Sequence, residues 1–362
     1  MTSTFDQEID LDPAAVVRAS LPEEARRRSE LMEKVRHVYL RTDRDTLLAK
    51  HFDRLLEDLT ERRDPDAHED ADGFAERLEG NIVVVLGPSG AGKTSAVRRL
   101  LSKHARVPNY GKKGVRCPVI TVRVPSPCSV GELGRVVLRA TGYPLRRTRV
   151  PSPEIWGTVR ERIQSLGILV LHLDEFQDAH VTLRADEQVK LRHLLRSLLV
   201  DEDYPIGLII SGQPEFEDFL RPDRSSVRRG SWQMFERIAL TKDREAIRTA
   251  LKELPRIACL GIKEAAVLAI LPRLVHAGCN LLGITIEEIH NAIRWALEAK
   301  ANELTIEHFE AAYAFRTGCL APWNPYVAAD YRDIDCTRVL ARSEPLPPPD
   351  GNKSKGKKGS KA

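Results

Sequence analysis

The chain has 362 residues, of which 42% are hydrophobic and 30% charged. These values are typical of globular proteins, and the length predicts roughly two domains of ~100–200 residues each. The longest apolar runs, at 82–86 and 168–173, are far shorter than the ~20 residues that a transmembrane helix needs. The first residues are acidic and lack an apolar stretch, so we expect no secretory signal, no membrane contact and a cytoplasmic location.

The formal net charge of +4 is an average over blocks of opposite sign. Residues 98–150 hold 13 Lys and Arg against one carboxylate, Glu132, and the last twelve residues hold five Lys and no acid. Residues 1–80 instead carry 21 Asp and Glu against 13 Lys and Arg. Because like charges repel within a compact fold, such blocks usually mark a partner surface or a tail.

The first predicted part is an acidic N-terminal helical segment at 1–79. Apolar residues recur at helical spacing at 22–39 and 43–59, which predicts two helices. The run 61–73 is nearly all charged and turn-forming, and indicates a loop.

The second part, residues 80–242, has the pattern of an α/β domain. Short Val/Ile/Leu runs alternate with segments long enough for helices, which predicts a parallel sheet covered on both faces, a three-layer arrangement. The four predicted strands are 82–86, 119–124, 168–173 and 206–211.

The third part, residues 243–320, is predicted to be a small helical domain. Thr285 begins a capping-box pattern for its third helix, and Thr305 is placed to cap its fourth. A C-terminal extension follows at 321–343, and the Pro- and Lys-rich tail at 344–362 has no means of forming a core, so we expect it to be disordered. The predicted helices are 245–253, 263–276, 286–300 and 306–315.

The strongest functional motif, GPSGAGKT, directly follows the first predicted strand and precedes a helical segment. Its glycines let backbone N–H groups face phosphate oxygens, and the helix adds its positive N-terminal end. Lys93 would reach the β- and γ-phosphates of ATP, and the Thr94 hydroxyl would bind Mg²⁺. The predicted ATP-binding residues are Gly87, Pro88, Ser89, Gly90, Ala91, Gly92, Lys93, Thr94 and Ser95.

A second motif is the pair of carboxylates that ends the strand at 168–173. Asp174 would hold Mg²⁺ through its water shell, while Glu175 would orient and deprotonate the attacking water. We therefore predict Glu175 and Lys93 as the catalytic residues. His172 lies inside this strand, and a packed, hydrogen-bonded role is favoured for it over a catalytic one.

Polar residues also end the strand at 206–211, which we expect beside the strand that ends in Asp174. Ser211 or Gln213 could therefore touch the γ-phosphate or the attacking water, as a sensor of nucleotide. Alternatively, both residues simply begin a turn before Pro214.

These motifs, in this order and with a helical domain after them, resemble the AAA+ ATPases, a class of P-loop NTPases. Within that class, softer similarity over residues 30–327 resembles the TniB/TnsC family of transposition regulators. The segments that carry it are the lead-in at 37–56, GPSGAGKTS, DEFQDAH (Asp174–His180), ISGQPEFEDFL (Ile210–Leu220) and NPY (Asn324–Tyr326).

The resemblance implies an ATPase that assembles rings or filaments on double-stranded DNA. It implies links to a target-selector protein of the TniQ type and to an integrase-type transposase, with ATP hydrolysis controlling disassembly. A helicase loader or origin-type ATPase shares the same motifs, and a nucleotide-gated signalling switch that binds only protein partners is a third alternative.

Two departures from the AAA+ pattern concern arginines. The position expected for a trans-acting arginine falls at Met234, so Arg228 and Arg229 become the candidates, with Arg237 another. These arginines could equally be surface charge or DNA contacts. No lid arginine is apparent at 278–283, so we expect slow or assembly-dependent hydrolysis.

The basic block around the second strand would neutralise DNA phosphates largely without regard to sequence. The resemblance places residues of this region against the DNA backbone. The alternative is that several pair with the acidic N-terminal segment. The predicted DNA-binding residues are Lys112, Lys113, Arg116, Arg123, Arg146, Arg147 and Arg149.

Overall fold

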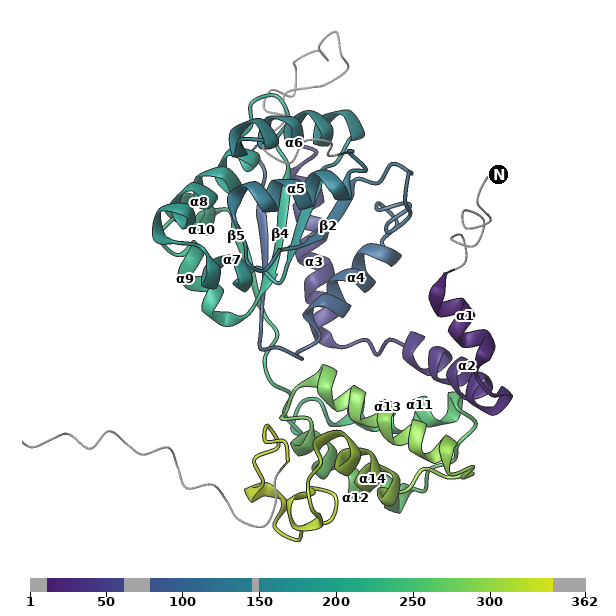
Figure 1. Ribbon diagram of the computed structural model, residues 1–362. Coiled ribbons are helices and arrows are strands. Elements are labelled where there is room, and N and C mark those ends of the chain that lie inside the picture. The colour runs from purple at the N-terminus through teal and green to yellow at the C-terminus, as the bar shows by residue number, and fades with distance from the viewer. Residues whose placement is uncertain (1–11, 62–78, 145–149, 341–362) are drawn as a thin grey trace, which may run out of the picture. The chain divides into compact units, whose positions relative to one another are not determined.

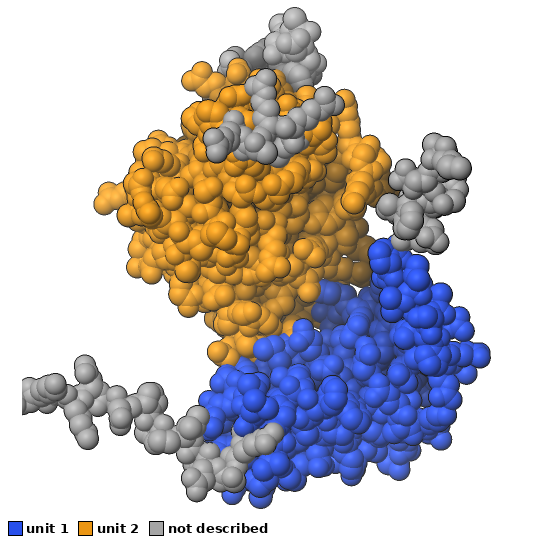
Figure 2. All heavy atoms as spheres, in the orientation of Figure 1, with its two compact units in different colours: residues 1–40, 239–280, 284–362 blue, residues 41–238, 281–283 orange. Residues whose placement is uncertain are grey.

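The computed structural model describes residues 12–61, 79–144 and 150–340. The chain folds into two compact units (Figure 2). Unit 1 combines Met1–Leu40, Ala239–Asn280 and Ile284–Ala362, and unit 2 combines Arg41–Ile238 with Leu281–Gly283.

Unit 2 is built on a five-stranded sheet with the order β2-β3-β4-β1-β5, in which every strand pair is parallel (Figure 1). This confirms the predicted α/β class and all four predicted strands. The fifth strand was missed, because its sequence GSWQM lacks an apolar run and most of its residues are only half-buried. The strands are β1 (Ile82–Leu86), β2 (Val119–Arg123), β3 (Val170–Asp174), β4 (Gly207–Gly212) and β5 (Gly230–Met234).

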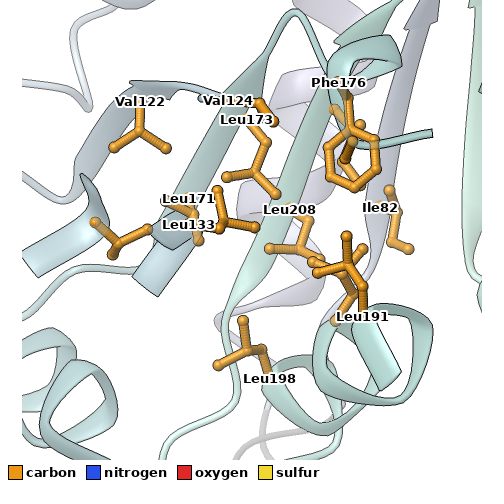
Figure 3. Packing of buried hydrophobic residues seen from close by; sticks show 14 of the residues in the cluster. Ile82, Val122, Val124, Leu133, Leu171, Leu173, Phe176, Leu191, Leu198 and Leu208 are labelled. Carbon is orange, nitrogen blue, oxygen red and sulfur yellow. The ribbon is translucent and has the colours of Figure 1, made fainter. Parts of the chain in front are cut away.

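Helices cover both faces of this sheet, which confirms the three layers. Figure 3 shows one face, where Leu133 of α5 and Leu191 and Leu198 of α8 pack against strand residues such as Leu171 and Leu208. The helices of unit 2 are α3 (Asp43–Asp58), α4 (Lys93–Lys103), α5 (Val130–Ala140), α6 (Ser152–Leu166), α7 (Gln177–Thr182), α8 (Ala185–Leu199), α9 (Glu217–Leu220) and α10 (Arg224–Arg228), with a 3₁₀ turn at Pro214–Phe216.

The other face is covered by α3, which begins at a capping box formed by Thr42 and Asp45. Phe52 and Leu55 of α3 are fully buried. A Cβ on Gly207 would lie 2.9 Å from Leu55 Cδ1, so the close approach of α3 to β4 favours a glycine there. Alternation along β4 sends Leu208 to the opposite face, where it joins the α5 and α8 core.

Unit 1 is helical. Its N-terminal and C-terminal helices are held partly by ion pairs, with 3.4 Å between Arg28 Nε and Glu298 Oε1 and 2.7 Å between Lys300 Nζ and Glu24 Oε1. Its helices are α1 (Pro13–Ser20), α2 (Glu23–His37), α11 (Arg244–Ile257), α12 (Glu264–Ala277), α13 (Leu282–Glu298) and α14 (Ile306–Thr317), followed by 3₁₀ turns at Ala321–Trp323 and Tyr331–Asp333. The first two residues of α13 are assigned to unit 2.

The four predicted C-terminal helices are confirmed, but one predicted cap is wrong. α13 begins at Leu282, so Thr285 lies inside the helix and is fully buried. The Thr285 hydroxyl packs tightly against Gly278, and a Cβ at residue 278 would overlap with the Thr285 oxygen. The predicted cap at Thr305 is confirmed, since Thr305 forms a capping box with His308.

Within the described ranges, no helix is long and apolar enough to cross a membrane. Apart from Glu61, the loop predicted at 61–73 lies outside the described residues, and so does the tail predicted at 344–362.

Candidate nucleotide-binding site

The predicted phosphate loop connects the carboxyl end of β1 to α4. Gly90 and Gly92 have φ values of 81° and 94°, which residues with a Cβ adopt at a cost. At Gly87 a Cβ would lie 2.7 Å from the Phe235 carbonyl oxygen, whereas the space at the Cβ position of Gly92 is open. The loop is therefore a backbone-lined turn at the N-terminus of α4, where anions are favoured.

Lys93 is the first residue of α4, and its side chain folds back over the loop. Its Nζ donates to the carbonyl oxygens of Gly87 at 2.7 Å and Pro88 at 3.0 Å. Burial lowers the pKa of this ammonium, and the carboxylates of Glu175 and Asp174 act in the opposite direction. A positive charge thus lies inside the loop, where phosphate oxygens would meet it.

Thr94 and Asp174 are 80 positions apart in the chain, and the fold brings their side chains together. The Thr94 hydroxyl donates to Asp174 Oδ1 at 3.1 Å, and Asp174 ends β3 at the carboxyl edge of the sheet. A hydroxyl and one carboxylate suit Mg²⁺, which prefers oxygen ligands and keeps several waters. Among the described residues, no cluster of three or more His, Cys, Asp or Glu could hold a metal by itself.

Glu175 has a left-handed backbone, with φ of 58°, a conformation that costs free energy for any residue with a Cβ. The Phe176 amide donates to the Ser211 carbonyl at 2.9 Å, and the Gln177 amide group donates to Glu175 Oε2. These bonds hold the half-buried Glu175 carboxylate at the end of β3. The sequence placed Gln177 in the DEFQDAH segment but indicated no role for it, since its contact with Glu175 depends on that turn.

An aromatic cluster lies beneath this turn. Phe176 contacts Phe216 and Phe219, with ring centroids 4.6 Å and 5.3 Å apart, and all three rings are fully buried. The segments DEFQDAH and ISGQPEFEDFL therefore pack on each other, and together they fix the backbone that carries Glu175.

Ser211 and Gln213 occupy different environments. Ser211 lies in β4 and is buried, and its hydroxyl donates to Asp174 Oδ1 at 2.6 Å. Gln213 immediately precedes the 3₁₀ turn that begins at Pro214, and its backbone N–H donates to the side-chain oxygen Oε1 of Gln177 at 3.3 Å. Gln213 thus begins a turn, as one alternative held, and Ser211 contacts the predicted metal ligand Asp174. A sensor role for either residue stays a prediction.

His172 is fully buried in β3, and burial lowers its pKa to about 4. Its Nε2 lies 3.0 Å from Ser211 Oγ and its Nδ1 lies 3.1 Å from Thr121 Oγ1. The expected packed, hydrogen-bonded histidine is confirmed. The sequence did not indicate that its partners would include Ser211.

The candidate trans-acting arginines flank β5. Arg228 ends α10 and is exposed, whereas Arg229 precedes β5 and pairs with Glu79. Arg237 is exposed beyond the carboxyl end of β5. Met234 lies in β5, before the buried Phe235.

Four of the predicted DNA-binding residues are exposed, namely Lys112, Lys113, Arg116 and Arg123. Arg123 ends β2, level with Asp174 on the neighbouring strand. The alternative of internal pairing applies to Arg106 of the same block, which lies 2.7 Å from Asp53 Oδ1. Three further candidates lie outside the described residues: Arg146, Arg147 and Arg149.

Comparisons with known proteins agree with this geometry. Residues 77–220 match a family model described as AAA domain. The chain is similar to the Aeropyrum pernix ORC2 protein in its ADPNP-ADP complexes, with 14% sequence identity and a TM-score of 0.51, over 76% of this chain and 67% of that chain. No curated protein sequence matches the chain.

A second similar structure is the Aeropyrum pernix ORC1 protein in complex with DNA, with 16% identity and a TM-score of 0.52, over 76% of this chain and 65% of that chain. Identities this low show a shared fold alone. Residues 77–220 thus carry an AAA domain, and the fold is that of the P-loop AAA+ proteins, as the sequence predicted.

Proposed function

We propose that this protein is an AAA+ ATPase that assembles on duplex DNA with ATP and regulates DNA transposition. The observation that carries the proposal is the position of the exposed cations of β2 and the loop before it. Arg123 ends the strand next to the one that ends in Asp174, so one of these cations lies at the same edge of the sheet as the nucleotide site, and the others precede the same strand in the chain.

The nucleotide chemistry follows from the site's own side chains. Lys93 and the loop amides would bind the β- and γ-phosphates, and Thr94 and Asp174 would hold Mg²⁺, which supplies positive charge to the phosphate oxygens. Glu175 would orient a water and accept its proton as the water oxygen bonds to the γ-phosphorus and the bond to the bridging oxygen breaks. ADP and phosphate are the products.

The exposed cations on and before β2 would bind the DNA backbone. Each phosphate contact releases counterions, so binding should depend steeply on salt and little on sequence. Lys112, Lys113 and Arg116 lie in one loop and can neutralise successive phosphates. Arg123 ends the strand that follows this loop and is a further candidate, and Arg146, Arg147 and Arg149 stay candidates from the sequence.

The transposition role rests on the TniB/TnsC-like segments. Two of them, DEFQDAH and ISGQPEFEDFL, pack together beneath Glu175. Their joint presence supports the proposal that the turn carrying Glu175 is built as in the TniB/TnsC family. By that resemblance the protein would form a ring or filament, with Arg228 or Arg229 acting on a neighbouring copy's nucleotide. Its partners would be an integrase-type transposase and a TniQ-like target selector.

The test is binding of the full chain to duplex DNA with a slowly hydrolysed ATP analogue, across a salt series and with electron microscopy of the products. We expect ATP-dependent rings or filaments and a steep loss of affinity with salt. An absence of both binding and assembly would refute the proposal.

A strand-transfer assay with an integrase-type transposase then separates transposition from the alternatives. Stimulation of target joining supports the proposal. Loading of a replicative helicase without such stimulation would favour the loader alternative, and nucleotide-dependent binding to proteins without DNA would favour the switch.

A further inference from the structure

A chain of hydrogen bonds runs across three strands from the basic loop to the nucleotide site. Tyr110 Oη lies 2.7 Å from Thr121 Oγ1, which lies 3.1 Å from His172 Nδ1. His172 Nε2 lies 3.0 Å from Ser211 Oγ, and Ser211 donates to Asp174 Oδ1 at 2.6 Å. Asp174 also accepts from Thr94, so the chain ends on the predicted metal ligands.

The chemistry of the end residue fixes the direction of every bond. The Ser211 hydroxyl donates to Asp174, so its one hydrogen is used there and Ser211 Oγ must accept from His172 Nε2–H. A neutral imidazole carries one N–H, so His172 Nδ1 accepts the Thr121 hydrogen, and Thr121 Oγ1 accepts the Tyr110 hydrogen. All donors thus point toward Asp174, an arrangement in which neighbouring bonds polarise each other.

The outer end of the hydrogen-bond chain lies in the loop at 104–118, between α4 and β2. Tyr110 is half-buried, and burial raises its pKa. The neighbouring Asn109 has φ of 63°, and its carbonyl accepts from the Lys112 amide at 2.9 Å. The exposed cations Lys112 and Lys113 therefore follow the anchored tyrosine after one glycine, Gly111.

We propose that Tyr110, Thr121 and His172 are positioning residues that orient Asp174 for the metal, so that the basic loop sets the metal affinity of the nucleotide site. DNA held by Lys112 and Lys113 would shift Tyr110, and the chain would carry the shift to Asp174. This regulation rests on the proposed function, both for the metal at Asp174 and for DNA at the loop.

The decisive substitutions change one hydroxyl each. Thr121→Val keeps the shape of the side chain and removes the hydroxyl, whereas Thr121→Ser keeps the hydroxyl. Tyr110→Phe removes only Oη, and Tyr143→Phe is the matched control, since Tyr143 is partly exposed elsewhere in unit 2. Substitutions of the fully buried His172 are avoided because they endanger the fold.

The first measurement contains no DNA and no turnover. Electron paramagnetic resonance of Mn²⁺, titrated into the protein with a non-hydrolysable ATP analogue, gives the metal affinity directly. We expect Thr121→Val and Tyr110→Phe to weaken metal binding about fivefold, as the loss of one bond in a network predicts. Thr121→Ser and Tyr143→Phe should bind as the wild type does.

The tautomer of His172 is a second, independent readout. Nitrogen NMR of the side chain should show the proton on Nε2 in the wild type and in Thr121→Ser. Unchanged metal affinity in Thr121→Val, an equal loss in Thr121→Ser, or a proton on Nδ1 would each overturn the positioning role.

The last measurement repeats the Mn²⁺ titration with saturating duplex DNA. DNA should change the metal affinity of the wild type and of Tyr143→Phe, and this change should disappear in Tyr110→Phe. A change that persists in Tyr110→Phe overturns the coupling. If the wild type does not bind duplex DNA, the proposed function and the coupling both fail, while the titration without DNA still decides the positioning role.

Discussion

Two buried carboxylates, one in each unit, have opposite surroundings. Asp174 of unit 2 is 2% exposed, and its Oδ1 accepts from the Ser211 hydroxyl, the Thr94 hydroxyl and the Glu175 amide. Glu288 of unit 1 is 1% exposed, and its Oε1 lies 2.5 Å from Arg316.

The surroundings of Glu288 are incompletely paired. Within the described residues, its Oε2 has no hydrogen-bond partner, and neither do the hydroxyls of Thr285 and Tyr326. Burial raises the pKa of Glu288 to about 7, against the opposing effect of Arg316. Three donors thus converge on Asp174 and hold it in place, whereas burial with few donors raises the pKa of Glu288.

The most severe substitution on the Asp174 side of this comparison is Lys93→Ala. It removes the ammonium from the phosphate loop, and we expect at least a ~100-fold loss of nucleotide affinity, as two charge-assisted hydrogen bonds would supply. Titration with a fluorescent ATP analogue measures it. Lys190→Ala, on the exposed face of α8, is the control, and retained affinity in Lys93→Ala would contradict the loop assignment.

Glu175→Gln should leave nucleotide affinity within about twofold and slow hydrolysis ~100-fold or more, because a general base typically contributes 10²–10⁴. The amide retains the size of the side chain and can still contact Gln177. Phosphate release measures the effect, with the exposed Glu161→Gln on α6 as control. Assemblies on DNA should persist longer in Glu175→Gln, and normal turnover would show that Glu175 is not the base.

Glu288→Gln tests the other side of the comparison. The folded pKa is raised to about 7, so between pH ~4.5 and ~7 the folded state keeps a proton that the unfolded state loses. Wild-type stability should therefore fall as pH rises through this window, at up to ~1.4 kcal/mol per pH unit.

Glu288→Gln cannot lose that proton, so its stability should rise relative to the wild type by about 2 kcal/mol between pH 5 and 7. Urea unfolding at a series of pH values measures it. The exposed neighbour Glu287→Gln should keep the wild-type slope. An unchanged slope in Glu288→Gln would show that this carboxyl does not titrate there.

The smallest effect is expected for exposed charges, which water and salt screen. Reversal of both Lys112 and Lys113 to Glu should weaken duplex binding by about tenfold at moderate salt and flatten its salt dependence. ATP binding by the monomer should stay unchanged. Lys190→Glu is the control, and an unaltered salt slope would remove the two lysines from the interface.

The sequence predicted those features that are local or that follow from strand ends. GxxxxGK[ST] is contiguous, so its loop needs no tertiary information. The meeting of Thr94 and Asp174 followed from the rule that parallel strands present their carboxyl ends at one edge. The trans-acting role of Arg228 or Arg229 stays a prediction, because it requires a second copy.

The hydrogen-bond chain could not be predicted from the sequence because it depends on the register between neighbouring strands. Thr121 pairs with His172 across β2 and β3, and His172 pairs with Ile209 of β4, relations that no spacing in one strand reveals. Thr285 misled for the opposite reason. The local sequence pattern around Thr285 is that of a helix cap, but Thr285 lies inside α13, where it packs against Gly278.

The one-way hydrogen-bond chain also has an evolutionary consequence. Because each inner member, Thr121, His172 and Ser211, both donates and accepts, replacing one leaves a buried polar atom of its neighbour unpaired. Relatives in which a leucine stands at the position of His172 should therefore also have an apolar residue at the position of Thr121. Substitutions at the buried positions of the hydrogen-bond chain should therefore occur together, whereas Lys112 and its exposed neighbours can be substituted one at a time.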